Sequence, residues 1–246
     1  MLYSLSMMNL NEKQIAFNNA MKKYHEKKIY QYIYKLVSIL NISMQFYLLY
    51  WLFFVNIEWY SFIGLFLLSY FMTDFINGYV HMYMDNNDSY QSFVGPFIAS
   101  FHLHHRTPNY RKFSIFRIYF NESGSKFWLV PFLMLTVILS LFSVNEYFLL
   151  SLIFIGILSS VAEVSHFLCH NSNSKIVLFL QKMNILLSME HHASHHEKDN
   201  QSYAFLNGMS DFLLDRIASK VYGGYKENSD LHAMTYVGSD TDNRIS

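Results

Sequence analysis

The sequence predicts an all-α integral membrane protein, with four transmembrane helices in two hairpins and a histidine-rich cap on the cytoplasmic side. Three observations predict this class. Apolar residues make up 52% of the 246 residues and charged residues only 15%, against about a quarter in ordinary soluble domains. Long apolar stretches occur in two pairs. All 18 Lys and Arg residues lie outside these stretches and outside the short turns within each pair.

The N-terminal segment is polar and of mixed charge. It lacks the apolar core and small-residue cleavage site of a signal peptide, so we expect residues 1–35 to form a cytosolic, partly helical tail. The formal net charge is zero, which gives no indication of nucleic-acid binding. The lone Cys169 excludes an internal disulfide and a thiolate zinc site.

Each predicted hairpin consists of two stretches that are long enough, as helices, to cross a hydrocarbon layer of about 30 Å. A turn of a few residues, without Lys or Arg, joins the two stretches of each pair. The four predicted spans are residues 36–56, 59–84, 127–144 and 147–170.

The basic residues predict the orientation of these spans. Every Lys and Arg falls in one of three segments, residues 1–35, 85–126 and 171–246. Four spans place all three segments on one face, and Lys and Arg prefer the cytoplasmic side. All twelve histidines lie on that face or at helix ends opening onto it. Ion-transport paths usually place ionisable groups deep in the bilayer, so this distribution disfavours a transporter.

Histidines cluster at both helix ends that open onto this face. Asp74, Asn77 and His81 follow at intervals of three and four residues, so they share one helical face. The same spacing rule places Glu163 on one face with a histidine pair near the end of the fourth span. The members of that pair are His166 and His170.

Two further clusters lie in polar segments. "HLHHRTP" contains His102, His104 and His105, and "MEHHASHH" contains four histidines within six positions, namely His191, His192, His195 and His196. We expect His25 and His232 to be solvated residues of the tails, and we leave His102 outside the site because its spacing from His104 suits a loop.

A bound metal stabilises such a cluster of histidines, because it binds imidazole in the neutral form. Nine histidines exceed the three or four ligands of a zinc site, so the number favours two metals. Without a cysteine set and with few carboxylates nearby, two irons in an all-nitrogen site fit best. Such a pair activates O₂ for attack on an unactivated C–H bond. Four polar residues are candidates to orient the ligands: Asp74, Asn77, Glu163 and Glu190.

The motifs "DFINGYVHMYMD", "HHRTP", "EVSHFLCH" and "MEHHASHHEKDNQSYAFLNGMSDFLLDRI" resemble, in order and spacing, the lipid desaturases that include plasmanylethanolamine desaturase and a plastid phosphatidylglycerol desaturase. The resemblance runs from about Asp74 to about Ile217. It implies a lipid desaturase domain over residues 36–225, between the N-terminal tail and a C-terminal tail over residues 226–246.

The resemblance implies a di-iron enzyme that uses O₂ and two electrons to introduce a double bond into an acyl or alkyl chain of a phospholipid, with the plasmalogen vinyl ether among the products. No catalytic residue is implied beyond the metal ligands, which are His81, His104, His105, His166, His170, His191, His192, His195 and His196. Two positions depart from the family pattern: Asn184 stands where a further histidine often occurs, and Met82 where tryptophan is usual.

The expected partners are a phospholipid in the membrane and an external electron donor, a b-type cytochrome or a ferredoxin, because the chain has no flavin or haem motif. We expect the lipid headgroup near the basic residues Arg106, Arg111, Lys112 and Arg117. The expected location is a multi-pass position in the endoplasmic reticulum or the bacterial inner membrane. A di-iron lipid hydroxylase remains an alternative, and a metal-binding or metal-transport membrane protein is a third.

Overall fold

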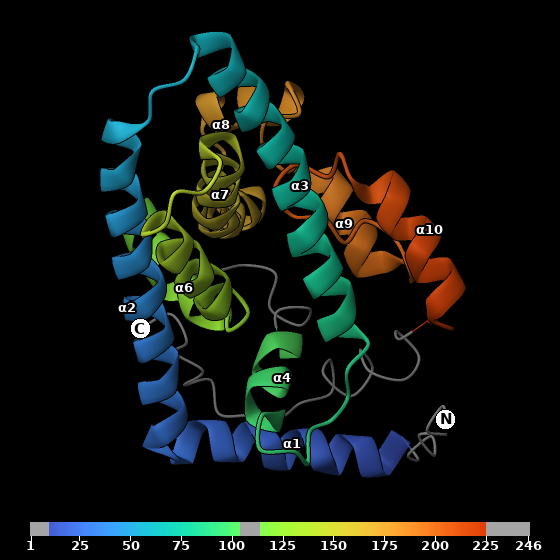
Figure 1. Ribbon diagram of the computed structural model, residues 1–246. Helices are drawn as coiled ribbons and strands as arrows, with labels where there is room; N and C mark the ends of the chain where they lie inside the picture. The colour runs from blue at the N-terminus through green and yellow to red at the C-terminus, as the bar shows by residue number, and fades with distance from the viewer. Residues whose placement is uncertain (1–9, 104–113, 225–246) are drawn as a thin grey trace.

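The computed structural model describes residues 10–103 and 114–224, and every regular element within these ranges is helical (Figure 1). Two long helices, α2 (Lys28–Trp51) and α3 (Trp59–Asp85), are joined through the short 3₁₀ helix η1 (Leu52–Phe54) and diverge from this connection (Figure 1). A third long helix, α7 (Glu146–Asn171), packs against α3 and is seen nearly end-on between α2 and α3 in Figure 1.

Three helices in the described part of the chain are long and apolar enough to cross a membrane by themselves. They cover Lys28–Phe54, Trp59–Asp85 and Glu146–His170. These ranges correspond to the first, second and fourth predicted spans. Many large apolar side chains of the first two are exposed, which is the expected arrangement for helices that face lipid, whereas 72% of the third is buried between other helices.

The predicted third span, residues 127–144, contains a helix that is shorter than predicted. Its helix, α6 (Leu129–Ser140), has 12 residues and is therefore about 18 Å long, less than the hydrocarbon thickness of about 30 Å. Only together with the preceding Ile115–Ser125, bent from it by 97°, is it long enough to cross. The structure thus contains three candidate spans, or four if this bent pair counts as one.

Backbone carbonyls at the bend form hydrogen bonds with a polar side chain of another helix. The preceding segment consists of α5 (Ile115–Glu122) and the 3₁₀ helix η3 (Ser123–Ser125). The side-chain amide of Asn41 on α2 donates to the carbonyl of Ser123 at 2.9 Å and to that of Lys126 at 3.2 Å. These carbonyls therefore have partners outside their own helix, and the chain can turn at this point without leaving them unsatisfied.

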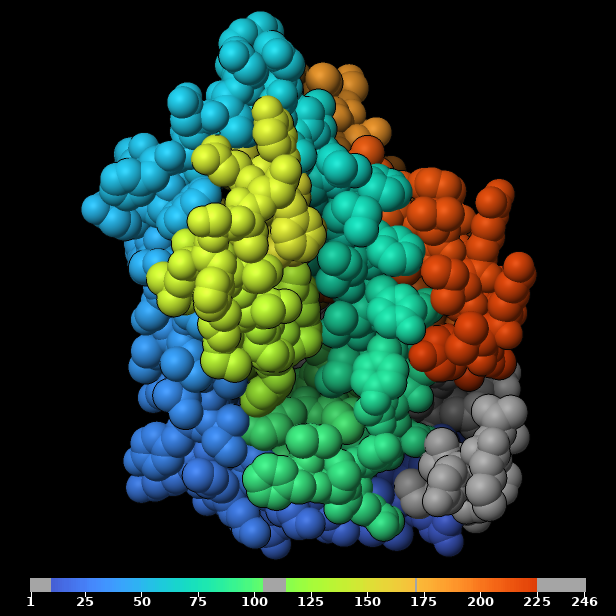
Figure 2. Space-filling model, in the orientation of Figure 1, coloured from blue at the N-terminus to red at the C-terminus, as the bar shows by residue number. Residues whose placement is uncertain are grey.

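Apolar packing joins α2, α6 and α7. Figure 2 shows α6, in yellow-green, filling the face between α2 and α3. The cluster that joins the three helices consists of Leu48, Leu129, Leu133, Leu149 and Ile153, all 1% exposed or less.

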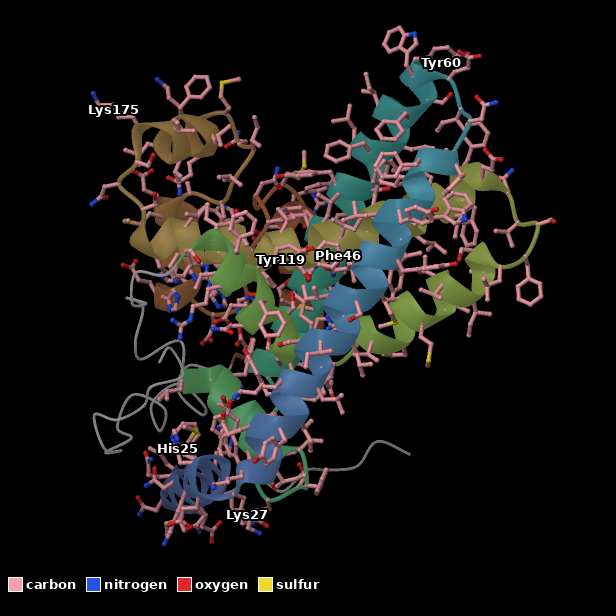
Figure 3. All side chains as sticks on the ribbon, turned by 90° about the vertical axis from the view of Figure 1, so that its left-hand side faces the viewer. His25, Lys27, Phe46, Tyr60, Tyr119 and Lys175 are labelled. Carbon is pink, nitrogen blue, oxygen red and sulfur yellow. The ribbon has the colours of Figure 1, made fainter. Side chains whose placement is uncertain are left out.

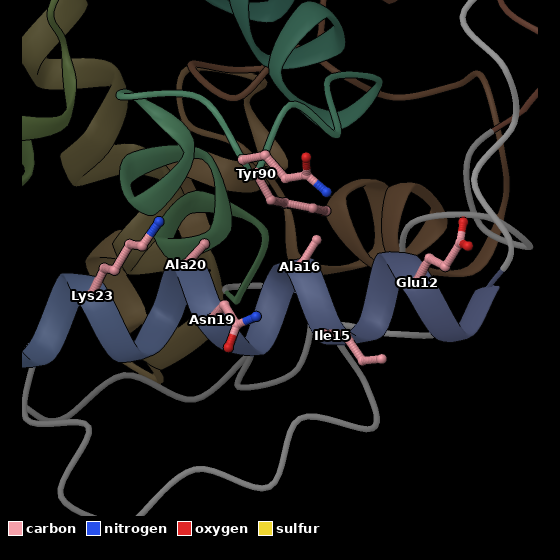
Figure 4. A pocket seen from close by; sticks show the side chains of 8 residues that line it. Glu12, Ile15, Ala16, Asn19, Ala20, Lys23 and Tyr90 are labelled. Atoms are coloured by element: carbon pink, nitrogen blue, oxygen red, sulfur yellow. The ribbon is translucent and has the colours of Figure 1, made fainter.

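Part of the predicted N-terminal tail is a packed helix. Helix α1 (Leu10–Glu26) lies across the lower end of α2 in Figure 1 and packs against α4 (Gly95–His102). It buries Phe17 and Met21 completely. An open groove runs beside α1, where Tyr90 lies over the helix and Ile15 points away (Figure 4).

Three short helices follow α7 and carry the C-terminal half of the candidate site: α8 (Lys175–Lys182), α9 (Met189–Glu197) and α10 (Asp211–Val221). Helix α9 packs on α7, and α10 packs on α3. In Figure 3, Lys175 at the start of α8 and Tyr60 at the start of α3 lie on opposite sides of the molecule, with α7 running between these sides. The candidate site lies at the C-terminal ends of α3 and α7.

Gly78 allows the close approach of α10 and the loop before it to α3. A Cβ at this position would lie 2.4 Å from Leu214 Cδ1 and 2.9 Å from the Ala204 Cα. We expect Gly78→Ala to lower the free energy of unfolding by about 1–3 kcal/mol through overpacking. Thermal unfolding followed by circular dichroism in detergent measures this.

Gly64→Ala is the matched control, because it lies on the same helix with no atom within 4 Å of the added Cβ. It should leave Tm unchanged or raise it, since alanine has the higher helix propensity. Equal Tm values for the two variants would show that the contact at Gly78 is not tight.

Candidate metal centre

Seven side chains with metal-binding atoms converge from three helices. His81 and Asp85 occupy the last turns of α3, one helical turn apart, and His166 and His170 occupy the last turns of α7 with the same spacing. The remaining three lie on α9, whose N-terminus is capped by the Ser188 hydroxyl, which accepts from the His191 N–H. They are His192, His195 and His196.

One set, here called the aspartate group, consists of His81, Asp85 and His195, and all three are buried. Asp85 Oδ2 lies 3.4 Å from His81 Nε2 and 3.3 Å from His195 Nε2. The other ring nitrogen of each histidine faces a backbone carbonyl. His81 Nδ1 lies 2.9 Å from the Tyr203 oxygen, and His195 Nδ1 lies 3.3 Å from the Gln201 oxygen.

These carbonyls determine which nitrogen carries the proton. A carbonyl oxygen only accepts, so each Nδ1 must donate to it, and a neutral ring then has a lone pair on Nε2. Both lone pairs point toward the Asp85 carboxylate, which is itself an acceptor when ionised. Three acceptors facing one another in a buried space repel one another, and a cation between them removes that repulsion.

The second set, here called the four-histidine group, consists of three histidines that together could hold one metal ion, His166, His170 and His192, and of His196 beside them. His192 Nε2 lies 2.9 Å from His166 Nε2 and 2.9 Å from His196 Nε2. His170 Nε2 lies 3.3 Å from His166 Nε2. With metal–nitrogen bonds of about 2.1 Å, neighbouring ligand nitrogens lie about 3.0–3.4 Å apart, so the separations of His166 Nε2 from the His192 and His170 nitrogens are close to the edges of one coordination shell.

The protonation state of His192 agrees with a ligand role. Burial, followed by the proximity of His166, lowers the pKa of His192 well below its usual value. Its imidazole is therefore neutral at physiological pH, and the neutral form is the one that binds metal. The four-histidine group also matches the chemistry of its donors, since imidazole suits iron, zinc and copper.

The two groups adjoin. The rings of His192 and His195 stack with centroids 5.5 Å apart and an interplanar angle of 24°. The rings of His81 and His166 have centroids 6.4 Å apart. Phe205 packs between the groups, with its centroid 5.4 Å from that of His81 and 5.5 Å from that of His166. Two groups that could each hold a metal ion therefore lie next to each other.

His191, which the sequence analysis counted among the ligands, is in neither group. Its Nε2 lies 2.6 Å from Asp211 Oδ2, and this hydrogen bond raises the pKa of His191. Asp211 also accepts from the Ala204 N–H at 2.8 Å. Gly208, with φ 84°, passes directly beside the imidazole, where a Cβ would lie 2.7 Å from His191 Nε2. His191 thus fastens α9 to the loop before α10.

His102 and Asn184 fall outside the two groups as well. His104 and His105 lie outside the described residues. His102, which the sequence analysis left out, uses both ring nitrogens, one near the Tyr90 hydroxyl and one 2.7 Å from the Met84 carbonyl. Asn184 has an exposed side chain at a turn with φ 53°, and its carbonyl accepts from Asn207 at 2.7 Å.

The polar residues expected to orient ligands differ in what they contact. Asp74 Oδ1 accepts from the N–H groups of residues 206, 207 and 208, and its Oδ2 accepts from the N–H and hydroxyl of Ser210. Asp74 thereby holds the loop that follows Phe205. Glu163 Oε2 lies 3.9 Å from His166 Nδ1. Glu190 is exposed.

The sequence analysis missed Asp85, although it closes the motif "DFINGYVHMYMD" and stands four residues after His81. That spacing on a helix was the available signal. With Asp85, the candidate ligands include one carboxylate and are not all nitrogen. Met82, where the family usually has tryptophan, is 1% exposed and packs with Tyr203 and Leu214.

The comparison with protein families agrees with this geometry. A family model described as a lipid desaturase domain matches residues 70–222, more than half of the chain. The chain belongs to the lipid desaturase family. Both ligand groups lie within the matched range, so the family assignment and the site concern the same part of the molecule. No curated protein and no solved structure matches the chain.

The neighbours His191 and His192 provide a direct test of the ligand assignment. We expect His192→Ala to remove a nitrogen that lies 2.9 Å from two others and to lower metal affinity by about 100-fold or more. We expect His191→Ala to retain the metal content of the unmodified chain. Metal analysis of purified protein measures both variants. Equal losses in the two variants would place His191 among the ligands.

A substitution of Asp74 tests whether its carboxylate holds the loop after Phe205. Asp74→Asn replaces one of the two acceptor oxygens with a donor, so either the N–H groups of residues 206, 207 and 208 or the N–H and hydroxyl of Ser210 lose their acceptor. We expect the free energy of unfolding to fall by about 2–3 kcal/mol. Thermal unfolding measures this, with Glu197→Gln, an exposed acid on α9, as the control. A Tm equal to that of the control would contradict the assignment.

Proposed function

We propose that this member of the lipid desaturase family is a membrane-bound di-iron enzyme that uses O₂ and two electrons to introduce a double bond into an acyl or alkyl chain of a phospholipid. The observation that carries the proposal is the pair of adjoining ligand groups, which offer six imidazole nitrogens and one carboxylate. We further propose the vinyl ether of plasmalogens as one candidate product.

We propose that each of the two groups holds one ion. Within the four-histidine group, His166, His170 and His192 would hold one ion, with His196 beside them, and the aspartate group would hold the other. Iron bound at such a site supplies the oxidising power, with O₂, to remove hydrogen from an unactivated carbon. His104 and His105, named by the family resemblance, are proposed as further ligands.

The protein's own contribution is to orient these ligands and to exclude water. The carbonyls of residues 201 and 203 hold the rings of the aspartate group with Nε2 directed inward. His81, His192 and His195 are each 3% exposed or less. A dry site protects a reactive centre from side reactions with water.

Substrate and electrons would reach the centre from different directions. We propose that the lipid chain approaches along the apolar spans, with its headgroup near the basic segment that includes Arg117. The proposed electron donor is an external b-type cytochrome or ferredoxin on the cytoplasmic side. The absence of Lys and Arg from the turns at the opposite ends of the spans supports this orientation.

Lipid analysis of an expressing host tests the proposed reaction. We expect cells with the unmodified chain to contain a phospholipid with two hydrogens fewer than its precursor, and cells with His195→Ala to lack it. The reason is that His195 provides a buried ligand nitrogen 3.3 Å from Asp85. His25→Ala, at an exposed position on α1, is the control and should retain the product.

A lipid with one additional oxygen, in place of the unsaturated one, would show that the chain is a hydroxylase. An unchanged lipid profile in the presence of a suitable electron donor would contradict both reactions.

A further inference from the structure

Lys126 is a buried cation beside the candidate metal centre that the proposed reaction does not use. It follows η3 at the bend before α6, and it is 4% exposed. A charge in such a position is costly unless it is paired, so its partners indicate its role.

A side chain that binds Lys126 also lies next to the four-histidine group. Its Nζ donates to Glu163 Oε1 at 2.9 Å and to Asn77 Oδ1 on α3. The other oxygen of the Glu163 carboxylate lies 3.9 Å from His166 Nδ1. One carboxylate therefore binds the ammonium group and lies close to the ligand ring, within ion-pair range of His166 Nδ1 and beyond hydrogen-bond distance.

A second contact runs through an aromatic ring. Lys126 Nζ lies 4.8 Å from the centroid of the Phe205 ring, within the range of a cation–π interaction. Phe205 in turn packs against His166, with centroids 5.5 Å apart. Lys126 thus touches two of the side chains that surround this ligand.

The position of Lys126 is itself fixed. Asn41 on α2 binds its backbone carbonyl, as described for the bend. Gly124 in η3 lies so close to α2 that a Cβ there would be 2.6 Å from Ser38 Oγ and from the Tyr34 ring. The 3₁₀ turn is therefore docked tightly on α2, and Lys126 enters the interior from it.

We propose that Lys126 is a positioning residue for metal binding, acting through Glu163 on His166. The carboxylate beside His166 Nδ1 favours the tautomer with the proton on that nitrogen, which leaves the Nε2 lone pair for the metal. Lys126 fixes the Glu163 carboxylate in place and balances its charge. The proposal rests on the proposed metal function and concerns one of the two groups, because Glu163 contacts His166.

Cobalt(II) titration of the metal-free protein in detergent, followed by visible absorption, tests this proposal without lipid, O₂ or electron donor. We expect the unmodified chain to bind two equivalents. Lys126→Met, which keeps an apolar stem against Phe205, should weaken one site about 10–100-fold and leave the other unchanged. Lys126→Arg should restore the weakened site, and Lys182→Met, at an exposed position on α8, should have no effect.

A double variant separates the proposed path from general loss of structure. If Lys126 acts through Glu163, Lys126→Met combined with Glu163→Gln should bind no more weakly than Glu163→Gln alone. If Lys126→Met does not fold, Lys126→Gln with Glu163→Gln replaces it, because this pair leaves no buried charge unpaired, and the same selective loss is expected.

Wild-type affinity at both sites in these variants, or equal weakening of both sites without rescue by arginine, would overturn the proposal. An unmodified chain that binds two cobalt ions but yields no unsaturated lipid in cells would contradict the proposed function alone, so the two failures are distinguishable.

Discussion

Mutual repulsion among buried acceptors is the constraint on which the rest of this structure depends. In the aspartate group, backbone carbonyls of residues 201 and 203 fix the protons of His81 and His195 on Nδ1, so both Nε2 lone pairs face the carboxylate of Asp85. In the four-histidine group, imidazole nitrogens approach one another to about 3 Å. A cation bound between the acceptors of the aspartate group would remove their repulsion, so the interior of the site fits a metal ion.

The scaffold holds these groups through a small number of buried polar contacts. Ser165 on α7 accepts from the Leu187 N–H at 2.9 Å and donates to the Leu206 carbonyl at 2.6 Å, and so ties both flanking segments of α9 to one span. Asp74 and Asp211 anchor the loop that carries Phe205. Apolar packing of α2, α6 and α7 holds the N-terminal half of α7, away from its ligand end. The ligand geometry is therefore set by contacts from helices far apart in the sequence.

Hydropathy and helical spacing predicted much of this arrangement. The long uncharged runs predicted α2, α3 and α7, and spacing of four residues predicted that His166 and His170 would meet. Hydropathy could not predict the bend before α6, because the carbonyls at this bend are bound by Asn41 of a different helix. The sequence also could not distinguish His191 from His192, because the hydrogen bond between His191 and Asp211 depends on the tertiary structure. The ligand role of His104 and His105 stays a prediction.

Iron analysis of the detergent-purified chain, combined with X-ray absorption at the iron edge, tests the central claim most directly. The two adjoining groups predict two irons per chain, each in a ligand shell dominated by nitrogen, with iron present as the neighbour of iron. Near-zero iron together with full zinc occupancy, or a single isolated iron in the fully loaded protein, would contradict a di-iron centre.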